Sequence, residues 1–258
     1  MSRFVRFAHQ GQPRYGVVDD ARIELIDPHP FTPRWERTGE YVDLAGLRLL
    51  APVIPTKVIC VGKNYADHAA EMGGEVPSDP LFFLKPSSSV IGPNEPIQVP
   101  TELTQEVHHE AELAVVVGST IQRATPDEAA AGILGYTAAN DVTARDWQRR
   151  EDQWFRAKAF DTFLPLGPSI ATDLDLADTA VVCRVDGAVR QDGSTRDLVV
   201  DVPTLLAQIS QVTTLLPTDV VLTGTPAGVG PIEPGDVVEV EVGGVGSLVN
   251  PVVARKES

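Results

Sequence analysis

The segment HHEAELAVVVGSTIQRATPDEAAAGILGYTAANDVTARD, residues 108–146, decides how the rest of the chain is interpreted. It opens with Glu110 and Glu112, which stand two residues apart directly before the apolar run 113–117. That run predicts a buried strand, in which residues i and i+2 point to the same face. The two carboxylates are therefore expected to lie side by side.

A third carboxylate, Asp141, follows a second apolar stretch, residues 133–139. Like charges held close together repel one another unless a cation lies between them. Carboxylate oxygens are hard ligands, so three of them suit Mg²⁺, Mn²⁺ or Ca²⁺ better than Zn²⁺. The alternative is that a Glu-x-Glu pair at the end of a strand simply faces water, as most acidic side chains do.

The composition excludes several classes of protein. A chain of 258 residues, 43% of them hydrophobic, can fill one large core with or without a small appendage. A net charge of −15 argues against nucleic acid or an anionic membrane as the main partner. No apolar run reaches the length of a membrane span or of a signal-peptide core, so we expect a cytoplasmic protein.

The pattern predicts two parts, a small β-rich N-terminal domain over residues 1–52 and a main domain over residues 53–258. Two or three strands are expected in the small domain, and the stretch 29–39, with its two prolines, is expected to be a loop. Gly and Pro number 21 each, which favours turns and short strands. The fold class is therefore α+β, mostly β, with few helices.

Short apolar runs mark the strands of the main domain. They lie at residues 57–62, 81–86, 113–117, 136–142, 179–194 (a hairpin that turns at 186–187), 220–226, 236–242 and 246–254. Cys60 and Cys183 both lie in such runs, and we expect free, buried thiols.

Helices are predicted from their capping residues. Asn64 is a reasonable N-cap for a short helix over residues 65–72 that ends at Gly73–Gly74. Thr125 caps a second helix with Pro126 at its first position, and Asp201 opens a third.

Two residues of the first helix, His68 and Glu71, are three apart and share one face. A Glu that accepts a hydrogen bond from one imidazole nitrogen leaves the other nitrogen free as a general base. The alternative is a surface pair of little consequence, because exposed pairs at this spacing are common.

Further polar groups follow the third carboxylate. Arg145 and Gln148 would share a face if the segment 143–154 is a short helix, and could then hold the carboxylate or carbonyl group of an acid. Lys158, flanked by aromatic residues, could stabilise an enolate near a metal. By itself Lys158 is better interpreted as a lysine on a strand edge with its ammonium in water.

The stretch LTGTPAGVG, residues 222–230, is Gly-rich after a strand. It lacks the endings of a P-loop and the spacing of the dinucleotide fingerprint. Its backbone N–H groups and the Thr225 hydroxyl can still bind a carboxylate, although a tight structural turn is the simpler interpretation. No Gly-x-Ser-x-Gly or His-Glu-x-x-His motif is present, so neither a serine hydrolase nor a zincin is indicated.

Together these segments resemble the fumarylacetoacetate hydrolase family from about residue 56 to the end. The matching segments, in order, are VGKNYADHAAEMG, LFFLKPSSSVIGP, HHEAELAVVVG, GYTAANDVTARDWQ, AKAFDTFLPLGP and LTGTPAGVGP. The resemblance implies a mixed β-roll or sandwich with a few peripheral helices, a homodimer, and Mg²⁺ or Mn²⁺ as cofactor. The long N-terminal part of fumarylacetoacetate hydrolases proper is missing, so we do not expect that substrate.

The resemblance also implies roles for individual residues. The metal ligands fall on Glu110, Glu112 and Asp141, and the catalytic His–Glu pair of a lid helix on His68 and Glu71. The substrate-holding residues fall, in chain order, on Arg145, Gln148, Lys158 and Thr225, with Lys158 also catalytic. Lys63 stands where many relatives have Arg.

The expected function is a Mg²⁺-dependent reaction on a small 2-oxo or diketo acid, namely acylpyruvate C–C hydrolysis or oxaloacetate decarboxylation, through an enolate that the metal stabilises. Alternatives within the family are 2-hydroxyhepta-2,4-diene-1,7-dioate isomerase, 5-oxopent-3-ene-1,2,5-tricarboxylate decarboxylase and oxaloacetate tautomerase. An alternative of another class is a non-catalytic scaffold that binds a metal or ligand. Because these reactions share the enolate, the residues around the metal do not discriminate among them.

Overall fold

Strand β11, Ala111–Val117, is the centre of the fold, and all seven of its residues are buried. The computed structural model describes residues 2–74 and 76–256. In it β11 pairs antiparallel with β12, Ile133–Asn140, on one edge and with β17, Val220–Leu222, on the other. Strands that are buried on both faces are rich in branched apolar residues, and the run LAVVV meets that requirement.

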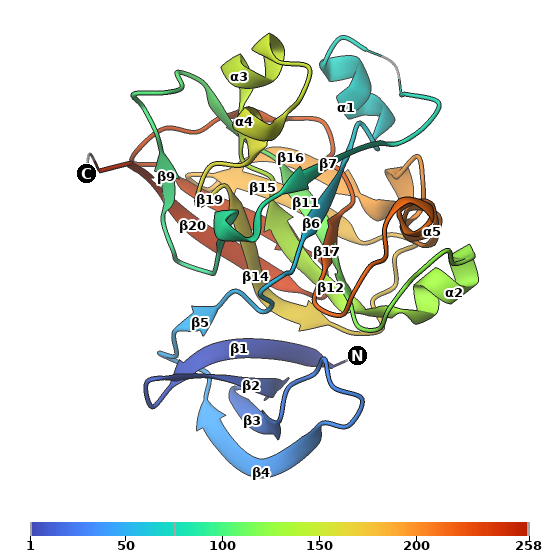
Figure 1. The fold of residues 1–258 in the computed structure, drawn as a ribbon. Helices are drawn as coiled ribbons and strands as arrows, with labels where there is room; N and C mark the ends of the chain where they lie inside the picture. Colours follow the sequence, from blue (N-terminus) through green and yellow to red (C-terminus); the bar gives the residue numbers. More distant parts are fainter. Residues whose placement is uncertain (1, 75, 257–258) are drawn as a thin grey trace.

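The large sheet extends from β11 in both directions (Figure 1). Beyond β17 lie β6 (Val58–Gly62), which runs parallel to β17, and the edge strand β7 (Leu81–Lys85). Beyond β12 lies β14 (Leu164–Ala171), which also pairs in parallel with the two-residue strand β8 (Val90–Ile91). The sheet is therefore mixed.

The N-terminal strands form an antiparallel meander at one end of the molecule (Figure 1). They are β1 (Arg3–His9), β2 (Gln12–Asp19), β3 (Arg22–Asp27) and β4 (Glu36–Asp43), and β5 (Leu49–Leu50) returns to pair with β1. The meander thus has more strands than the two or three predicted.

Two details of this region differ from the sequence-based expectation or qualify it. The prediction of a loop over residues 29–39 is wrong at its end, because β4 begins at Glu36 and takes backbone hydrogen bonds from β3. In addition, β1 pairs with β14 through Phe4 and Ile170, so the meander continues the large sheet. A domain boundary at residue 52 stays a prediction.

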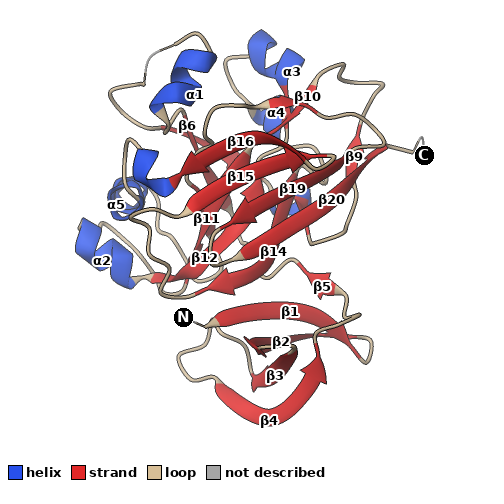
Figure 2. Ribbon diagram, turned by 180° about the vertical axis from the view of Figure 1, so that it is seen from behind, coloured by secondary structure: helices blue, strands red, loops and turns tan. Residues whose placement is uncertain are grey.

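A second sheet covers one face of the first. Its strands, in spatial order, are β16 (Ala188–Ser194), β15 (Ala180–Val185), β19 (Val237–Val242), β20 (Gly246–Ala254) and β9 (Ile97–Val99). Figure 2 shows these strands in front of β11, β12 and β14. The arrangement is the predicted mostly-β α+β fold.

The side chains of β11 alternate between two cores, as a period of two requires. Leu113 and Val115 pack into the core shared with the second sheet. Ala114 and Val116 point to the opposite face, where Phe4 of the N-terminal meander packs. Glu112 is two residues from Ala114, so its side chain points to the same face as those of Ala114 and Val116. It lies at the end of the strand that is next to Glu110.

Short elements gather at that end. A small sheet of β10 (Val107–His109), β13 (Thr143–Ala144) and β18 (Gly230–Pro231) lies there. Three short helices lie at the same end of the molecule (Figure 1): α1 (Ala66–Glu71), α3 (Arg145–Arg150) and α4 (Phe155–Lys158). The remaining helical segments lie elsewhere: α2 (Pro126–Ala131), α5 (Val202–Val212), η1 (Ser87–Ser89) and η2 (Thr195–Asp197).

Two of the predicted helix starts are confirmed. The Thr125 hydroxyl accepts from the Glu128 N–H, and the Glu128 carboxylate accepts from the Thr125 N–H, which makes a complete capping box for α2. Asp201 caps α5 by accepting from the Thr204 N–H at 2.8 Å.

The predicted N-cap role of Asn64 is wrong. Tyr65 occupies that position and makes no side-chain capping bond. The Asn64 amide instead donates to the carbonyls of Val200 and Thr223, at 3.0 and 2.9 Å, and accepts from the Val200 N–H. Asn64 therefore ties the start of α1 to the Gly-rich loop, and these long-range bonds satisfy its amide more completely than a cap would.

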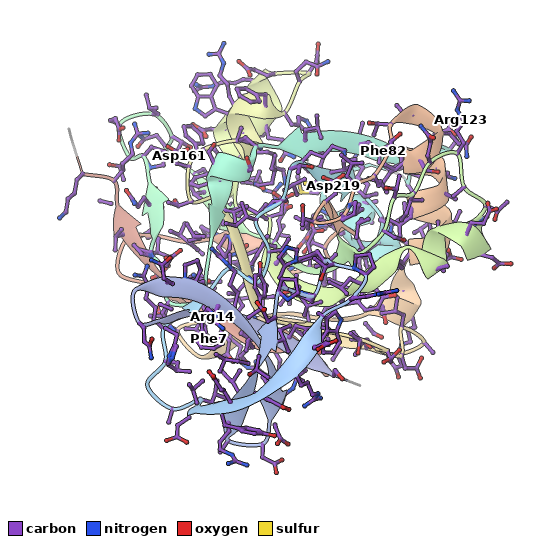
Figure 3. All side chains as sticks on the ribbon, turned by 60° about the horizontal axis from the view of Figure 1, so that its bottom comes forward. Phe7, Arg14, Phe82, Arg123, Asp161 and Asp219 are labelled. Atoms are coloured by element: carbon purple, nitrogen blue, oxygen red, sulfur yellow. The ribbon has the colours of Figure 1, made fainter. Side chains whose placement is uncertain are left out.

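The two cysteines and two charged side chains illustrate which groups are buried. Cys60 and Cys183 are free and buried, as predicted. Asp219 is buried and Arg123 is exposed, and both are labelled in Figure 3. The Asp219 carboxylate accepts from Lys57 and thereby joins the starts of the parallel strands β6 and β17. No helix in the described part of the chain has the length and hydropathy needed to cross a membrane.

The capping box gives a test of the fold. Thr125→Ala should lower the free energy of unfolding by about 1 kcal/mol, because the Glu128 N–H at the start of α2 loses its acceptor. The measurement is chemical denaturation. The control is Thr120→Ala, whose hydroxyl is exposed, and it should change stability by less than about 0.5 kcal/mol. Equal losses in the two variants would contradict the assignment.

Candidate active site

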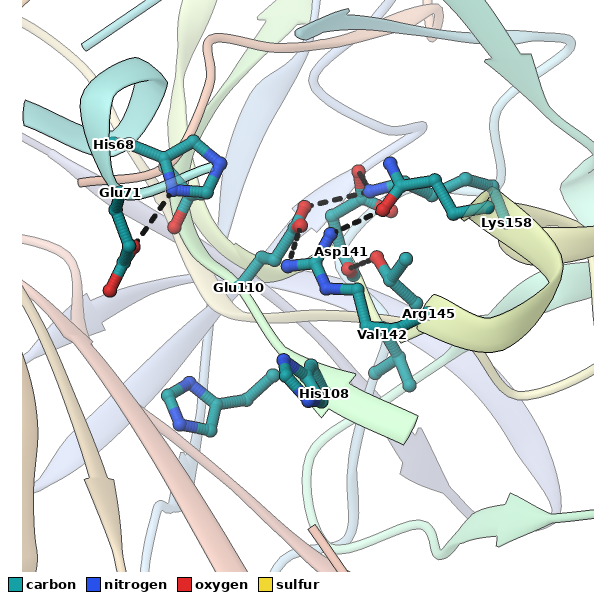
Figure 4. Close-up of polar contacts among 12 residues, drawn as sticks. His68, Glu71, His108, Glu110, Asp141, Val142, Arg145 and Lys158 are labelled. Carbon is teal, nitrogen blue, oxygen red and sulfur yellow. Dashed lines mark hydrogen bonds and ion pairs between the residues drawn. The ribbon is translucent and has the colours of Figure 1, made fainter. Parts of the chain in front are cut away.

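Three buried carboxylates meet where β11 begins, and two of them, Glu110 and Asp141, are labelled in Figure 4. Glu110 lies at the break between β10 and β11, Glu112 is the second residue of β11, and Asp141 directly follows β12. One oxygen of each lies within 4.8 Å of the others, and the residues are 4%, 2% and 0% exposed. Among the residues that the structure describes, this is the one group with the geometry of a metal site. The alternative of a solvated strand end does not hold.

The backbone fixes this convergence. The Asp141 N–H donates to the Glu110 carbonyl at 2.8 Å, and the Glu110 N–H donates to the side chain of Asn140 at 2.9 Å. Ala111 and Asn140 are register partners in the β11–β12 ladder. The three carboxylates therefore rest on two adjacent, fully paired strands.

Three cationic side chains neutralise two of the three carboxylates. Lys158 donates to Glu110 and Asp141, both at 2.7 Å, and Lys85 donates to Asp141 at 2.6 Å. Arg145 forms an ion pair with Glu110 at 2.5 Å. All three cations are buried, and a buried charge is stable only when it is paired.

The interpretation of Lys158 as a strand-edge lysine is wrong. It ends the short helix α4, and its Nζ lies between two carboxylates and 5.0 Å from the centre of the Phe83 ring. Lys85 was not identified from the sequence, where it appeared only as the last residue of the strand LFFLK. The available signal was a lysine that ends an apolar strand, since such a lysine needs a buried partner.

The ionisation of the carboxylates follows from these contacts. Burial raises the pKa of Glu110, but Lys158 and Arg145 outweigh it and hold that pKa well below its usual value. Burial, reinforced by the charges of Asp141 and Glu110, raises the pKa of Glu112 well above its usual value. Burial lowers the pKa of Lys158, but its two carboxylate partners raise it above the ordinary range overall.

Glu112 is the carboxylate whose negative charge a bound cation would neutralise. Within residues 2–74 and 76–256, no Lys or Arg side chain pairs with it, and its partner is the Gly224 N–H at 2.7 Å. A divalent cation between the three carboxylates would supply the missing positive charge. The hard oxygen donor set fits Mg²⁺ or Mn²⁺.

His68 and Glu71 lie on the α1 side of the carboxylates (Figure 4). His68 is 6% exposed, and its Nδ1 lies 3.2 Å from Glu71 Oε2. Both Glu71 oxygens also accept from the Gly228 N–H, at 3.0 and 3.2 Å. The pair is therefore no loose surface contact, and it leaves the Nε2 atom of His68 available.

Arg145 and Gln148 share one face of α3, as expected for a helix. Arg145 Nη1 donates to Gln148 Oε1 at 2.6 Å. The Nε atom of Arg145 is buried and makes no hydrogen bond within the described residues. The Nη2 atom forms the ion pair with Glu110 but likewise makes no hydrogen bond of good geometry, so two nitrogens of this guanidinium keep unused donors.

The Gly-rich loop supports the site from below. The Thr225 hydroxyl donates to the Ala111 carbonyl at 2.8 Å and accepts from Gln191 at 2.7 Å. Gly224 has φ +99°, and a Cβ there would lie 2.9 Å from the Cβ of Asn64, so glycine is required. Thr225 lines the cavity, but its hydroxyl proton is already engaged, and its role toward a substrate stays a prediction.

A cavity of about 200 Å³ opens above the carboxylates. Its buried end holds the three carboxylates with His68, Arg145, Lys158 and Thr225, and its outer end is half-buried or exposed. The outer end is lined by Lys63, Met72, Gln148, Arg149 and Trp154. Because sites for drug-sized ligands usually measure about 300–1,000 Å³, this cavity suits a small molecule.

Known proteins share this architecture. The human mitochondrial oxaloacetate tautomerase FAHD2A is 41% identical over 261 residues, which cover 96% of this chain and 79% of that protein. The crystal structure of 2-hydroxyhepta-2,4-diene-1,7-dioate isomerase from Mycobacterium marinum is 43% identical, with a TM-score of 0.92 and full coverage of both chains.

A third relative concerns the metal. Maleylpyruvate hydrolase from Sphingobium sp. SYK-6, solved in complex with manganese(II) and pyruvate, is 32% identical with a TM-score of 0.80 and covers 98% of this chain and 100% of that one.

Two family models match the chain. One, Rv2993c-like, N-terminal, matches residues 2–52, and the other, fumarylacetoacetate (FAA) hydrolase C-terminal, matches residues 57–253. The second match spans most of the chain and includes every side chain of the cavity. The chain belongs to the fumarylacetoacetate hydrolase family.

Proposed function

We propose that this protein is a Mg²⁺-dependent enzyme that interconverts the keto and enol forms of a small 2-oxo acid. The observation that carries the proposal is the group of three buried carboxylates with a His–Glu pair beside it. Support comes from relatives named for proton transfer, an oxaloacetate tautomerase and a dienedioate isomerase. Mn²⁺ would satisfy the same ligands.

The chain provides a place for each part of a 2-oxo acid. Glu110, Glu112 and Asp141 would hold the cation, which supplies a Lewis acid beside the 2-oxo group. An ammonium group has three N–H donors, and Lys158 uses two of them on carboxylates, so one remains for the oxygen that gains negative charge. The unpaired Nε of Arg145 can donate to the acid's carboxylate.

His68 is the candidate base. Glu71 holds Nδ1, so Nε2 can accept the proton from the carbon next to the 2-oxo group and return it to the oxygen, or carry it in the reverse direction. The Gly228 N–H fixes Glu71 and hence the ring of His68. A non-catalytic scaffold would have no use for a base held in this way.

A second candidate is hydrolysis of an acylpyruvate. The same Nε2 could take a proton from water, which then attacks the distal carbonyl of the substrate. The relative solved with manganese and pyruvate, a maleylpyruvate hydrolase, favours this alternative. Decarboxylation of oxaloacetate, which breaks a bond without a base, is the third.

Glu112→Gln should weaken Mg²⁺ binding more than about 100-fold, because loss of a direct ligand exceeds the 10- to 100-fold effect of outer groups. Calorimetry with Mg²⁺ and decay of the oxaloacetate enol absorbance measure binding and turnover. The control, Glu40→Gln, changes an exposed residue. Metal-dependent turnover that persists in Glu112→Gln would contradict the ligand assignment.

His68→Asn should lower the rate of proton transfer by about 10²- to 10⁴-fold, the usual contribution of a general base. Mg²⁺ affinity should stay unchanged, because His68 is not one of the proposed ligands. Hydrolysis of acetylpyruvate should fall more than decarboxylation of oxaloacetate, measured as pyruvate release. An equal fall in both reactions would count against the role of His68 as base.

A further inference from the structure

Lys63 is a cation at the outer end of the cavity for which the proposed reaction has no role. It lies between β6 and α1 and lines the cavity. Its backbone has φ +58°, a left-handed conformation that few residues other than glycine adopt. Such a conformation persists where the surrounding structure holds it, and it is common at ligand sites.

Every other cationic side chain at the site has a carboxylate partner. Lys85, Arg145 and Lys158 pair with Glu110 or Asp141. Arg149 is 60% exposed and pairs with Glu106. Lys63 has no ion pair with any residue in the ranges 2–74 and 76–256.

The end of α1 leaves room for the Lys63 ammonium. A Cβ on Gly74 would lie 2.9 Å from Lys63 Nζ, closer than real Cβ contacts allow. Gly74 therefore lets the ammonium lie against the helix end, on the wall of the cavity that also carries His68 and Met72. The charge is held near the mouth, away from the buried carboxylates.

The net charge of the site indicates which kind of ligand this end of the cavity binds. The three buried carboxylates are matched by three buried cations, so a divalent metal would leave the inner site with two positive charges. Lys63 adds a third positive charge, so a 2-oxo acid with one carboxylate would leave two charges unmatched, whereas a dicarboxylate dianion would leave one. In a cavity of about 200 Å³ that Lys63 also lines, we expect the far end of a short diacid to lie near the Lys63 ammonium.

We propose that Lys63 binds a second, distal carboxylate, so that the site selects 2-oxo dicarboxylates over 2-oxo monocarboxylates. The inference rests on the proposed function, because chelation of the 2-oxo acid at the carboxylates sets the direction of the substrate. Lys63 is preferred over Arg149 because Glu106 already holds the Arg149 guanidinium.

The test compares oxaloacetate with its 4-methyl ester, which enolises but lacks the distal charge. Lys63→Met should lower kcat/KM for enol–keto interconversion of oxaloacetate by about 10- to 100-fold, the value of a hydrogen bond to a charged group. The ester should change less than about twofold. Lys63→Arg should restore most of the activity, and Arg123→Met, which changes an exposed arginine outside the cavity, should have little effect. An equal loss on both substrates, or no loss on either, would overturn the proposal.

A binding measurement separates this proposal from the proposed reaction. (S)-Malate and (S)-lactate both chelate a metal through a 2-hydroxy carboxylate, but malate alone has a distal carboxylate. Calorimetry on the Mg²⁺-loaded protein should show tighter binding of malate, and Lys63→Met should remove that preference without weakening lactate. If the wild-type protein turns over neither substrate, the reaction is wrong, and malate selectivity still decides the role of Lys63. Equal affinities for malate and lactate in the wild type would overturn it.

Discussion

Burial of three carboxylates at one point is the constraint on which the rest of this structure depends. Removing a single carboxylate from water costs several kcal/mol unless a partner compensates. The compensation comes from Lys85 on the edge strand β7, Arg145 on α3 and Lys158 on α4. Strand β7 and helices α3 and α4 contribute little to the apolar core, and their ion pairs with the buried carboxylates hold them at the end of β11.

The rigid part of the site lies on the large sheet, and the adaptable part lies on helix α1. The carboxylates lie at the end of the β11–β12 ladder, in which every residue of β11 is buried and both strands are paired on both edges. His68 stands on α1, a helix of six residues, which by itself is too short to be stable in water. Two tethers to the Gly-rich loop hold it, one from Asn64 and one from Glu71. The group proposed to move a proton thus lies on the element best able to adjust to a substrate.

Local patterns in the sequence correctly predicted those features that depend only on neighbouring residues. The period of two placed Glu112 on the face of a buried strand, and the capping residues Thr125 and Asp201 marked helix starts correctly. What failed depends on distant partners. Asn64 looked like a cap because nothing nearby reveals the carbonyls of Val200 and Thr223, and the carboxylate partner of Lys85 lies 56 residues away.

The surroundings of Lys158 also could not be predicted, because its partners are distant in the sequence. In isolation Lys158 resembles a surface lysine. Its helix ends among carboxylates that arrive from β11 and β12. No propensity or period encodes that meeting, because it depends on how helix α4 packs against the end of the large sheet. The resemblance to a family supplied this residue where the physics of a single segment did not.

Because all three proposed reactions need the same inner site, the choice among tautomerisation, hydrolysis and decarboxylation would be made at the mouth of the cavity. A β-keto acid loses CO₂ as its distal carboxylate gives up its negative charge to the rest of the molecule. A cation that holds this carboxylate stabilises the charged ground state and so opposes the loss. With Lys63 in the role proposed above, the site would favour proton transfer next to the 2-oxo group and keep the diacid intact. The ammonium that selects the substrate would thereby also select the reaction.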